Sequence, residues 1–201
     1  ANDAAGSDRF GYSVGIYGDY CIVGAYGDDD GGSDSGSAYI FLRNGTSWSQ
    51  QAKLTANDAA AGDYFGWSVG IDGDYCIVGA YADDDNAGNS GSAYIFTRSG
   101  TSWSQQAKLT ASDAAGSDYF GYSVRIHGDY CIVGAYSNDD GGNNSGSAYI
   151  FVRDDTSWSQ QAKLIASDAA AGDYFGYSVG IYEDYCIVGA YSNDDGGNNS
   201  G

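Results

Sequence analysis

One unit of 55 residues recurs along this chain, and this repeat restricts the fold more than any other feature. The phrase Asp-Tyr-Cys-Ile-Val-Gly-Ala-Tyr occurs at 19–26, 74–81, 129–136 and 184–191. The phrase Thr-Ser-Trp-Ser-Gln-Gln-Ala-Lys-Leu occurs at 46–54, 101–109 and 156–164. The copies are residues 1–55, 56–110 and 111–165, followed by a shorter copy at 166–201. Such an array buries apolar residues between neighbouring copies, so the interface between copies is part of the fold.

Each complete copy predicts four short strands and no helix. The chain has 32 Gly, 19 Tyr and no Pro, a composition that disfavours helices and favours pleated, half-buried surfaces. Gly18-Asp19 and Asn44-Gly45 predict tight hairpin turns, and the residues from 27 to 36 predict a polar loop. In the first copy the predicted strands are Phe10–Ile16, Tyr20–Tyr26, Ser37–Arg43 and Ser47–Leu54.

The burial pattern of these strands favours a β-propeller blade. The second strand is apolar on both faces, as in a sheet covered on both sides. In the fourth strand the residues Trp48, Gln50, Ala52 and Leu54 alternate with Ser49, Gln51 and Lys53, which predicts one face in water. Gly11, Gly15 and Gly24 would permit close backbone approach near a crowded centre. The predicted fold class is all-β, with tandem four-stranded antiparallel blades. A β-solenoid is the alternative, although its rungs are usually shorter than 55 residues.

Three short motifs repeat at fixed places in the unit. Phe-Gly opens the first strand at 10–11, 65–66, 120–121 and 175–176. Gly-Ala-Tyr ends the second strand at 24–26, 79–81, 134–136 and 189–191, and the complete copies continue with Gly-Ser-Ala-Tyr-Ile-Phe. This pattern resembles the FG-GAP repeat of integrin α-subunits and of many bacterial surface proteins, with Tyr in place of Pro. The resemblance implies an extracellular propeller, usually of seven blades, that acts in adhesion or ligand binding.

One departure from that family concerns calcium. Many members carry a loop of the Asp-x-Asp-x-Asp-Gly type between the first and second strands. Here the connection is Tyr17-Gly18-Asp19, Asp72-Gly73-Asp74, His127-Gly128-Asp129 or Tyr182-Glu183-Asp184. One or two carboxylates cannot supply the six to eight oxygens that Ca²⁺ prefers. The family's calcium site is therefore not expected in this chain.

Acidic residues gather instead in the loop after the second strand. With neighbouring Ser and Asn oxygens this loop could hold a cation such as Ca²⁺, which would order the loop rather than catalyse a reaction. The alternative is a set of solvated turns. The candidate ligands are Asp28, Asp30, Asp34, Asp83, Asp85, Asp139, Asp140, Asp194 and Asp195.

Tyrosines end the second strand beside each acidic loop, at Tyr26, Tyr81, Tyr136 and Tyr191. Aromatic rings beside carboxylates can hold sugars, which makes a lectin-like site in each blade one hypothesis. The alternative is that these rings pack between blades.

Enzymatic activity is not expected. His127 is the single histidine and has no counterpart in the other copies, which argues against a Ser-His-Asp triad and a zinc site. The cysteines at 21, 76, 131 and 186 occupy one strand position in successive copies. Neighbouring blades would separate them by about 10 Å, beyond the reach of a disulfide, so buried free thiols are predicted.

The charge and the length of the chain limit the kinds of partner that it can bind. The net charge of −19 disfavours nucleic acid and anionic membranes, and no stretch is long and apolar enough to insert into a membrane. The fourth copy contains the first two strands only, which predicts completion by further blades of a longer chain or by further copies of itself. The expected function is a non-enzymatic extracellular or cell-surface scaffold for adhesion or for assembly into a surface structure or filament. A glycan-binding or protein-binding propeller is the alternative.

Overall fold

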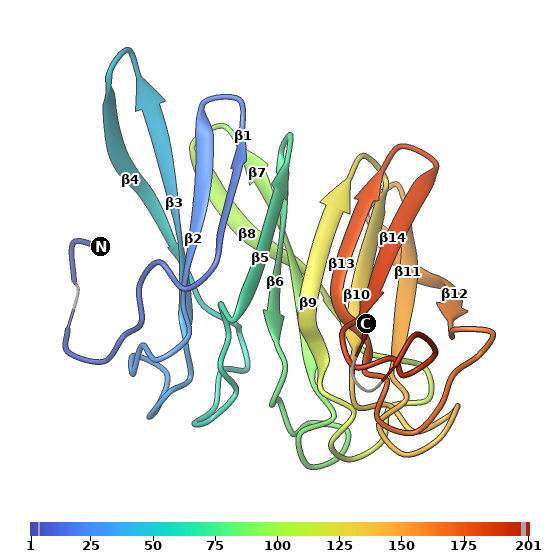
Figure 1. Cartoon of the computed structure of the whole chain (residues 1–201). Coiled ribbons are helices and arrows are strands. Elements are labelled where there is room, and N and C mark those ends of the chain that lie inside the picture. The colour runs from blue at the N-terminus through green and yellow to red at the C-terminus, as the bar shows by residue number, and fades with distance from the viewer. Residues whose placement is uncertain (4, 198–199) are drawn as a thin grey trace.

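The computed structural model describes residues 1–3, 5–197 and 200–201, and these residues form an open, propeller-like array of antiparallel sheets (Figure 1). Three sheets have four strands and the last has two, and every sheet is built from one copy of the repeat. The all-β blade architecture expected from the sequence is therefore confirmed. Within each complete sheet the strands pair in chain order: short turns join the first strand to the second and the third to the fourth, and the long acidic loop joins the second to the third.

The strand bounds recur with the repeat. The first sheet contains β1 (Val14–Tyr17), β2 (Tyr20–Ala25), β3 (Ser37–Asn44) and β4 (Ser47–Leu54). The second contains β5 (Ser68–Asp72), β6 (Tyr75–Ala80), β7 (Ser92–Ser99) and β8 (Ser102–Leu109). The third contains β9 (Phe120–His127), β10 (Tyr130–Ala135), β11 (Ser147–Asp154) and β12 (Ser157–Leu164). The last contains β13 (Phe175–Tyr182) and β14 (Tyr185–Ala190).

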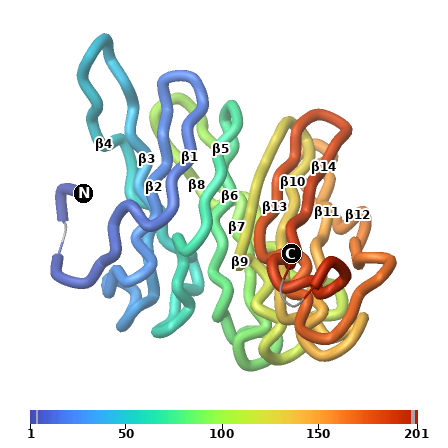
Figure 2. The backbone as a smooth tube through the Cα atoms, in the orientation of Figure 1, coloured from blue at the N-terminus to red at the C-terminus, as the bar shows by residue number. Residues whose placement is uncertain are grey.

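The sheets stand side by side as blades, with their hairpins at one end and their long loops at the other (Figures 1 and 2). The first strands β1, β5, β9 and β13 contact one another in sequence, whereas the fourth strands β4, β8 and β12 touch only slightly. The first strand is therefore the inner strand of each blade and the fourth is the outer one. The loops after β2, β6 and β10 lie together at the lower end of Figure 1.

The first strand of the first copy is shorter than predicted. The sequence predicts a strand from Phe10, but β1 begins at Val14. In later copies the corresponding Phe65, Phe120 and Phe175 form a parallel bridge with a glycine of the preceding blade. Phe10 makes no such bridge among the described residues and is 41% exposed. The bridge alone does not set the start of the strand, because Phe65 has it and β5 still begins only at Ser68, whereas β9 and β13 begin at Phe120 and Phe175.

The joint between blades explains the repeated Phe-Gly and Gly-Ala pairs. Phe65 is fully buried and its amide donates to the Ser35 carbonyl of the preceding blade. Gly66 has φ +92° and packs so closely on that blade that a Cβ built on Gly24 would lie 2.0 Å from the Gly66 oxygen. Only a glycine leaves room for this backbone contact. Within the preceding blade, Gly66 therefore docks against Gly24-Ala25, while Phe65 docks against Ser35-Gly36.

A β-bulge in the outer hairpin changes the predicted facing of the fourth strand. Phe41 pairs with Gln50 and Ile40 pairs with Ala52, so Gln51 is the extra residue. Beyond the bulge Lys53 pairs with Tyr39 and shares its face of the sheet. The simple alternation expected from the sequence is therefore wrong, and so is the expectation that Lys53 points into water: its side chain is only 18% exposed. The same bulge occurs in β7–β8 and β11–β12.

Candidate functional site

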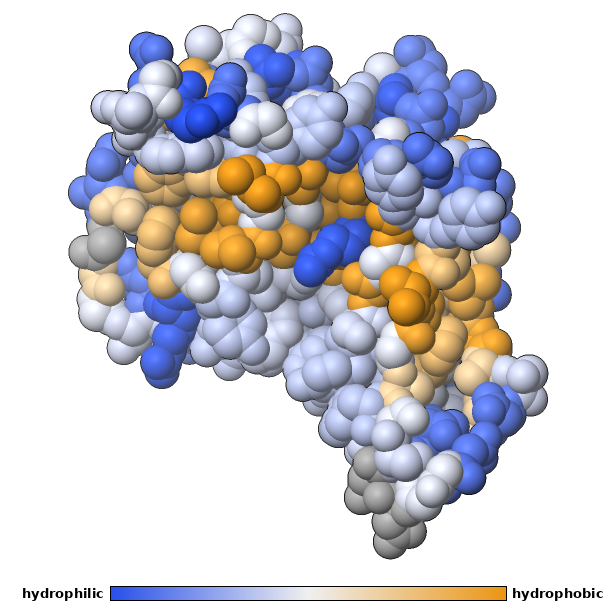
Figure 3. Space-filling view, turned by 45° about the horizontal axis from the view of Figure 1, so that its top comes forward, coloured by the Kyte–Doolittle hydropathy of each residue, from blue (hydrophilic) through white to orange (hydrophobic). Residues whose placement is uncertain are grey.

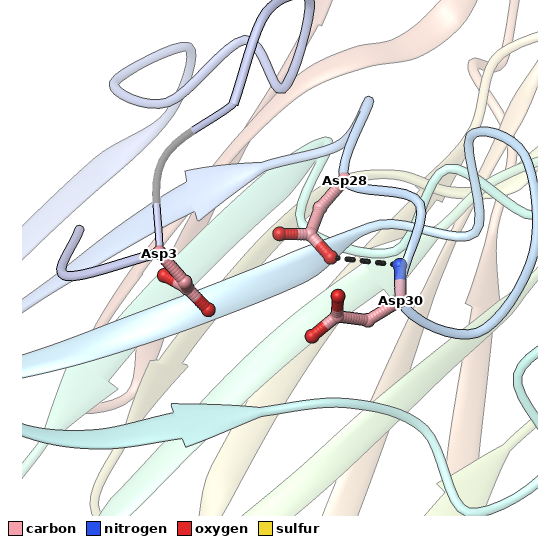
Figure 4. A group of neighbouring side chains, drawn as sticks. All are labelled: Asp3, Asp28 and Asp30. Carbon is pink, nitrogen blue, oxygen red and sulfur yellow. Dashed lines mark hydrogen bonds between the residues drawn. The ribbon is translucent and has the colours of Figure 1, made fainter.

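The acidic loop after the second strand is folded by its own hydrogen bonds. The Asp28 carbonyl accepts from the Gly36 amide at 2.8 Å, which closes the loop from residue 28 to residue 36. Ser35 is fully buried, and its hydroxyl accepts from the Gly31 amide at 3.0 Å. Asp28 Oδ1 accepts from the amide of Asp30 at 3.1 Å, the contact drawn in Figure 4. These hydrogen bonds within the loop fix the positions of the carboxylates without a ligand.

An ammonium group lies among these carboxylates. Lys53 Nζ is 2.8 Å from Asp3 Oδ2, 2.9 Å from Asp28 Oδ2 and 2.6 Å from Asp30 Oδ2. Asp28 is buried, and its Oδ2 also accepts from the Tyr39 hydroxyl at 2.9 Å. Figure 4 shows that Asp28 and Asp30 stand on one loop, that Asp3 comes from a separate segment, and that the three carboxylates lie near one another. We call Lys53 with these three aspartates a lysine–aspartate cluster.

The same cluster recurs in the next two blades with one variation. Lys108 contacts Asp58 and Asp83, and it makes a very short contact with Asp85. In the third blade Lys163 contacts Asp113 and Asp140, while Asn138 takes the place of the buried aspartate and accepts from Lys163 at 3.1 Å. In each blade the lysine joins three segments: the link before the first strand, the loop after the second, and the fourth strand.

Opposing effects act on the pKa values within these clusters. Burial acts to raise the pKa of Asp28, but hydrogen bonds from Lys53, the Asp30 amide and Tyr39 outweigh it and hold the pKa below its ordinary value. The balance at Asp58 is similar, with Lys108 as the opposing partner. Burial acts to lower the pKa of Lys108, yet its aspartate partners raise it overall. Lys108 and Asp58 therefore stay charged as an ion pair over a wide pH range.

The structure places the predicted metal ligands in several different settings. Five of them form ion pairs with the lysines of the clusters: Asp28, Asp30, Asp83, Asp85 and Asp140. Asp34 and Asp139 serve the loop: the Asp34 amide donates to Asp29 Oδ1, and Asp139 Oδ1 accepts from the Asn144 amide. Asp194 and Asp195 lie in the fourth copy, where the neighbouring Asp168 carboxylate raises the pKa of Asp195.

Carboxylate oxygens of Asp3, Asp28 and Asp30 lie within 4.8 Å of one another, as do those of Asp58, Asp83 and Asp85. This spacing would suit a cation, but in both groups the lysine ammonium already contacts all three carboxylates. A Ca²⁺ ion at either place stays a prediction, and it would have to displace or share this ammonium.

Sequence reasoning overlooked the lysine and the aspartates of the link. Lys53, Lys108 and Lys163 recur at the 55-residue period, and so do Asp3, Asp58 and Asp113. A second repeated set, Asp8, Asp63, Asp118 and Asp173, is buried, and each carboxylate accepts from a link amide, such as that of Ala60 for Asp63 at 2.7 Å. Their recurrence in every copy was a signal available in the sequence.

The predicted tyrosine sites belong to a continuous aromatic row. Each ring at the end of the second strand packs on aromatic rings of its own blade and, where another blade follows, on rings of that blade. The Tyr81 ring, for example, stacks on Tyr64 with the ring centroids 5.5 Å apart and packs on Trp67 with the centroids 4.7 Å apart. Centroid distances along the row run from 4.4 to 5.8 Å. The row contains Tyr12, Tyr26, Tyr64, Trp67, Tyr81, Tyr119, Tyr122, Tyr136, Tyr174, Tyr177 and Tyr191.

The cysteines are free thiols with different surroundings. Cys76 and Cys131 are buried, and burial raises the pKa of both thiols. Cys21 is half-buried and Cys186 is exposed, so burial is wrong as a general expectation. Cys186 is on β14, and among the described residues the sheet of β14 contains β13 and β14 alone. His127 stacks on Tyr182 with ring centroids 4.8 Å apart.

Comparison with protein families agrees with this geometry. The FG-GAP repeat family matches the chain four times, over residues 1–41, 48–96, 103–151 and 158–201. The chain is an FG-GAP repeat protein. In this FG-GAP protein the motif residues form the joint between blades, and the long loops are fastened to the outer strand by lysine. The comparison with curated protein sequences found no match.

Stability at high pH follows from two of these groups. The lysine–aspartate contacts raise the pKa of Lys108. The contribution of these contacts to the free energy of unfolding is therefore complete below pH 10.5, the pKa of lysine in the unfolded chain, and is lost as the pH rises from there toward the higher pKa of the folded chain. Burial and neighbouring tyrosines raise the pKa of Tyr81 from 10 to about 12, so ionisation in the unfolded chain also lowers stability in that range. We expect the free energy of unfolding, measured by urea titration, to fall as pH rises above 10.

The Tyr81→Phe variant provides the control for this pH dependence. It removes the phenol and leaves the packed ring, so its free energy of unfolding should fall less steeply above pH 10 than that of the native chain. An equally steep decline in both proteins would show that Tyr81 makes no contribution.

Proposed function

We propose that this FG-GAP repeat protein is a non-enzymatic extracellular scaffold, used for adhesion or for assembly into a surface structure or filament. The observation that carries the proposal is the use of its acidic groups. In three consecutive blades the loop carboxylates contact Lys53, Lys108 or Lys163, which ties the loops to the blade. A carboxylate held in its charged form by an ammonium group is a poor proton donor near neutral pH. The loop carboxylates, which are the best candidates for catalytic groups, therefore stabilise the fold instead.

Membership of the FG-GAP repeat family supports the extracellular location and the non-enzymatic function in this proposal. FG-GAP repeats are typical of extracellular or surface proteins, and their propeller fold is typically non-enzymatic. Within the part of the chain that the structure describes, there is no helix with the length and apolar character to span a bilayer. The net charge of −19 favours solubility and disfavours non-specific binding to other acidic surfaces.

Antibody labelling of the source cells tests this proposal. An antibody raised against the 201-residue chain should label intact cells as strongly as permeabilised ones, while an antibody against a cytosolic protein should label only permeabilised cells. Labelling that requires permeabilisation would overturn the extracellular assignment.

Glycan binding is the second candidate, and the aromatic row is the observation that favours it. Tyr191 lies at one end of the row and is 53% exposed, so its ring can meet a sugar. A lectin-like chain should bind defined sugars on a glycan array, and Tyr191→Ala should abolish that binding. Tyr185→Ala is the matched control, because Tyr185 is 77% exposed and lies outside the row. Absence of binding by the native chain, or equal loss in both variants, would overturn this candidate.

A further inference from the structure

Figure 3 shows a face on which hydrophilic side chains surround a band of hydrophobic ones, the usual arrangement for polar groups that are free to meet water. The third blade contains a polar set that is removed from water. Asn138 and Asp118 are each 3% exposed, and Ser147 is fully buried. The Lys163 side chain, 16% exposed, reaches Asn138 from β12. An amine and an amide that meet beside a buried carboxyl group have the functional groups that an amide exchange requires.

The side-chain amide of Asn138 is held in one orientation by its neighbours. Its Nδ2 donates to Asp118 Oδ2 at 3.2 Å. Its Oδ1 accepts from Ser147 Oγ at 2.8 Å and from Lys163 Nζ at 3.1 Å. Because an ammonium group can only donate, the lysine requires the oxygen on its side, which turns the amide nitrogen toward Asp118. The amide therefore has the lysine at its oxygen and a carboxyl group at its nitrogen.

The lysine nitrogen is close to the carbonyl carbon of this amide. At 3.1 Å from Oδ1, Lys163 Nζ lies no more than about 4.3 Å from Asn138 Cγ, given the ordinary length of a carbonyl bond. Reacting atoms meet at about 3–3.5 Å, so a side-chain movement on the order of 1 Å is enough. The Ser147 hydroxyl and, at 3.3 Å, the Asp140 amide donate to Oδ1. These donors would stabilise the negative charge that grows on the oxygen during attack.

Asp118, in the link before β9, is placed to give a proton to the leaving nitrogen. Burial raises the pKa of its carboxyl group, although hydrogen bonds from the Ala115 amide and from Asn138 act in the opposite direction. A raised pKa favours the protonated carboxyl group, which can act as a general acid toward Asn138 Nδ2. The amide of Ala115 donates to the same carboxyl oxygen at 3.0 Å and fixes its position.

The lysine is held in its charged form until it reacts. Burial acts to lower the pKa of Lys163, but contacts with Asp113 and Asp140 raise it overall. The free amine, which is the form that attacks a carbonyl carbon, is therefore a minor species. A slow reaction that occurs once in each chain can still go to completion, because the released ammonia diffuses away.

We propose that Lys163 forms an isopeptide bond with Asn138, which joins β12 covalently to the loop after β10. Lys163 Nζ gives one proton to Asp113, and the free amine attacks Asn138 Cγ. Asp118 donates a proton to Nδ2 as the Cγ–Nδ2 bond breaks, and it recovers one from the attacking nitrogen. Ammonia leaves and takes up the proton held by Asp113. One carbon–nitrogen bond forms and one breaks, without an oxidant or a reductant. This modification goes beyond the scaffold function and does not depend on it.

The first two blades carry the same set with one difference, an aspartate in place of Asn138. In the first blade Asp28 Oδ2 lies 2.9 Å from Lys53 Nζ. Against the effect of burial, hydrogen bonds hold the pKa of Asp28 below its ordinary value. An amine does not attack an ionised carboxylate, so this pair stays an ion pair. Asp83 has the same place beside Lys108 in the second blade. We therefore expect the bond in the third blade alone.

Mass spectrometry of the intact 201-residue chain tests the bond. After incubation to constant mass, the native chain should be lighter than its sequence mass by one molecule of ammonia, and its digest should contain a branched peptide that joins Lys163 to Asn138. Lys163→Arg and Asp118→Ala should both keep their full sequence mass, with circular dichroism showing that each variant is folded. Asn138→Asp is the matched control: it gives the third blade the residue that the first two blades already accept, and it should also keep its full mass.

A gain of reaction provides the complementary test. Asp83→Asn gives the second blade the same reactants, because Lys108 lies 3.0 Å from Asp83 and burial raises the pKa of the nearby Asp63 carboxyl group. This variant should lose a second molecule of ammonia and yield a second branched peptide. A native chain that keeps its full sequence mass would overturn the proposal, and so would a loss of ammonia that persists in Lys163→Arg. An Asp83→Asn chain that loses only one ammonia would contradict the role given to the amide.

Discussion

The Gly79→Ala variant is expected to lose about 3 kcal/mol of unfolding free energy or more, with its Tm lowered by roughly 10 °C. A Cβ on Gly79 would lie 2.0 Å from the carbonyl oxygen and 3.0 Å from the carbonyl carbon of Gly121 in the next blade. Because those atoms belong to the backbone, no side-chain rotation can relieve the clash. The second and third blades must move apart, which opens their shared core.

Gly88→Ala is the matched control for this variant. Gly88 lies in the loop of the same blade, and a Cβ there would have no atom within 4 Å. Alanine at an unhindered site reduces the freedom of the unfolded chain, so this variant should match or slightly exceed native stability. Thermal and urea unfolding followed by circular dichroism measure both. Equal stability of Gly79→Ala and Gly88→Ala would contradict the close backbone joint.

Removal of a cluster lysine is the second change with a large expected effect. Lys108→Met should lower the free energy of unfolding by about 2–3 kcal/mol, because it leaves the buried Asp83 carboxylate without its cation. The loss should stay below that of a fully buried pair, since the Tyr94 hydroxyl still donates to Asp83 at 2.8 Å. Urea unfolding near neutral pH provides the measurement.

Two further variants separate the cluster from ordinary surface charge. Asp74→Asn removes the ion pair between Asp74 and Arg98. Because the Asp74 side chain is 56% exposed, the free energy of unfolding should fall by less than about 1 kcal/mol. Asp83→Asn added to Lys108→Met should recover part of the loss, because the third blade places Asn138 at this position. If Lys108→Met costs no more than Asp74→Asn, the cluster does not fasten the loop.

Much of the blade could be predicted from local patterns. Strand and turn signals at Tyr20, Gly18-Asp19 and Asn44-Gly45 give the observed hairpins, because such signals act between neighbours in the chain. The strand after Asn44-Gly45 is predicted with its observed bounds, Ser47–Leu54. The start of the first strand is predicted less accurately: β1 begins at Val14 and β5 at Ser68, each later than the Phe-Gly pair.

The candidate site was predictable only in part. Composition placed acidic residues in the loop after the second strand, and Asp28 and Asp30 do lie close together there. Their partner was missed because the bulge at Gln51 shifts the register within the fourth strand, and strict alternation then assigns Lys53 to the wrong face. The contribution of Asp3 depends on how the link before β1 crosses to β4, a path that no local pattern specifies.

By itself the sequence determined the 55-residue unit, its four strands, and the Phe-Gly and Gly-Ala motifs, because these depend on periodicity and on local backbone preference. Only the tertiary structure decided what the motifs do: Gly66 docks against Gly24-Ala25 of the preceding blade, and Phe65 bridges to Gly36 there. It also decided that Lys53, and not solvent alone, meets the loop carboxylates. Both outcomes join residues that are far apart in the chain, and such contacts depend on how blades and segments pack in space.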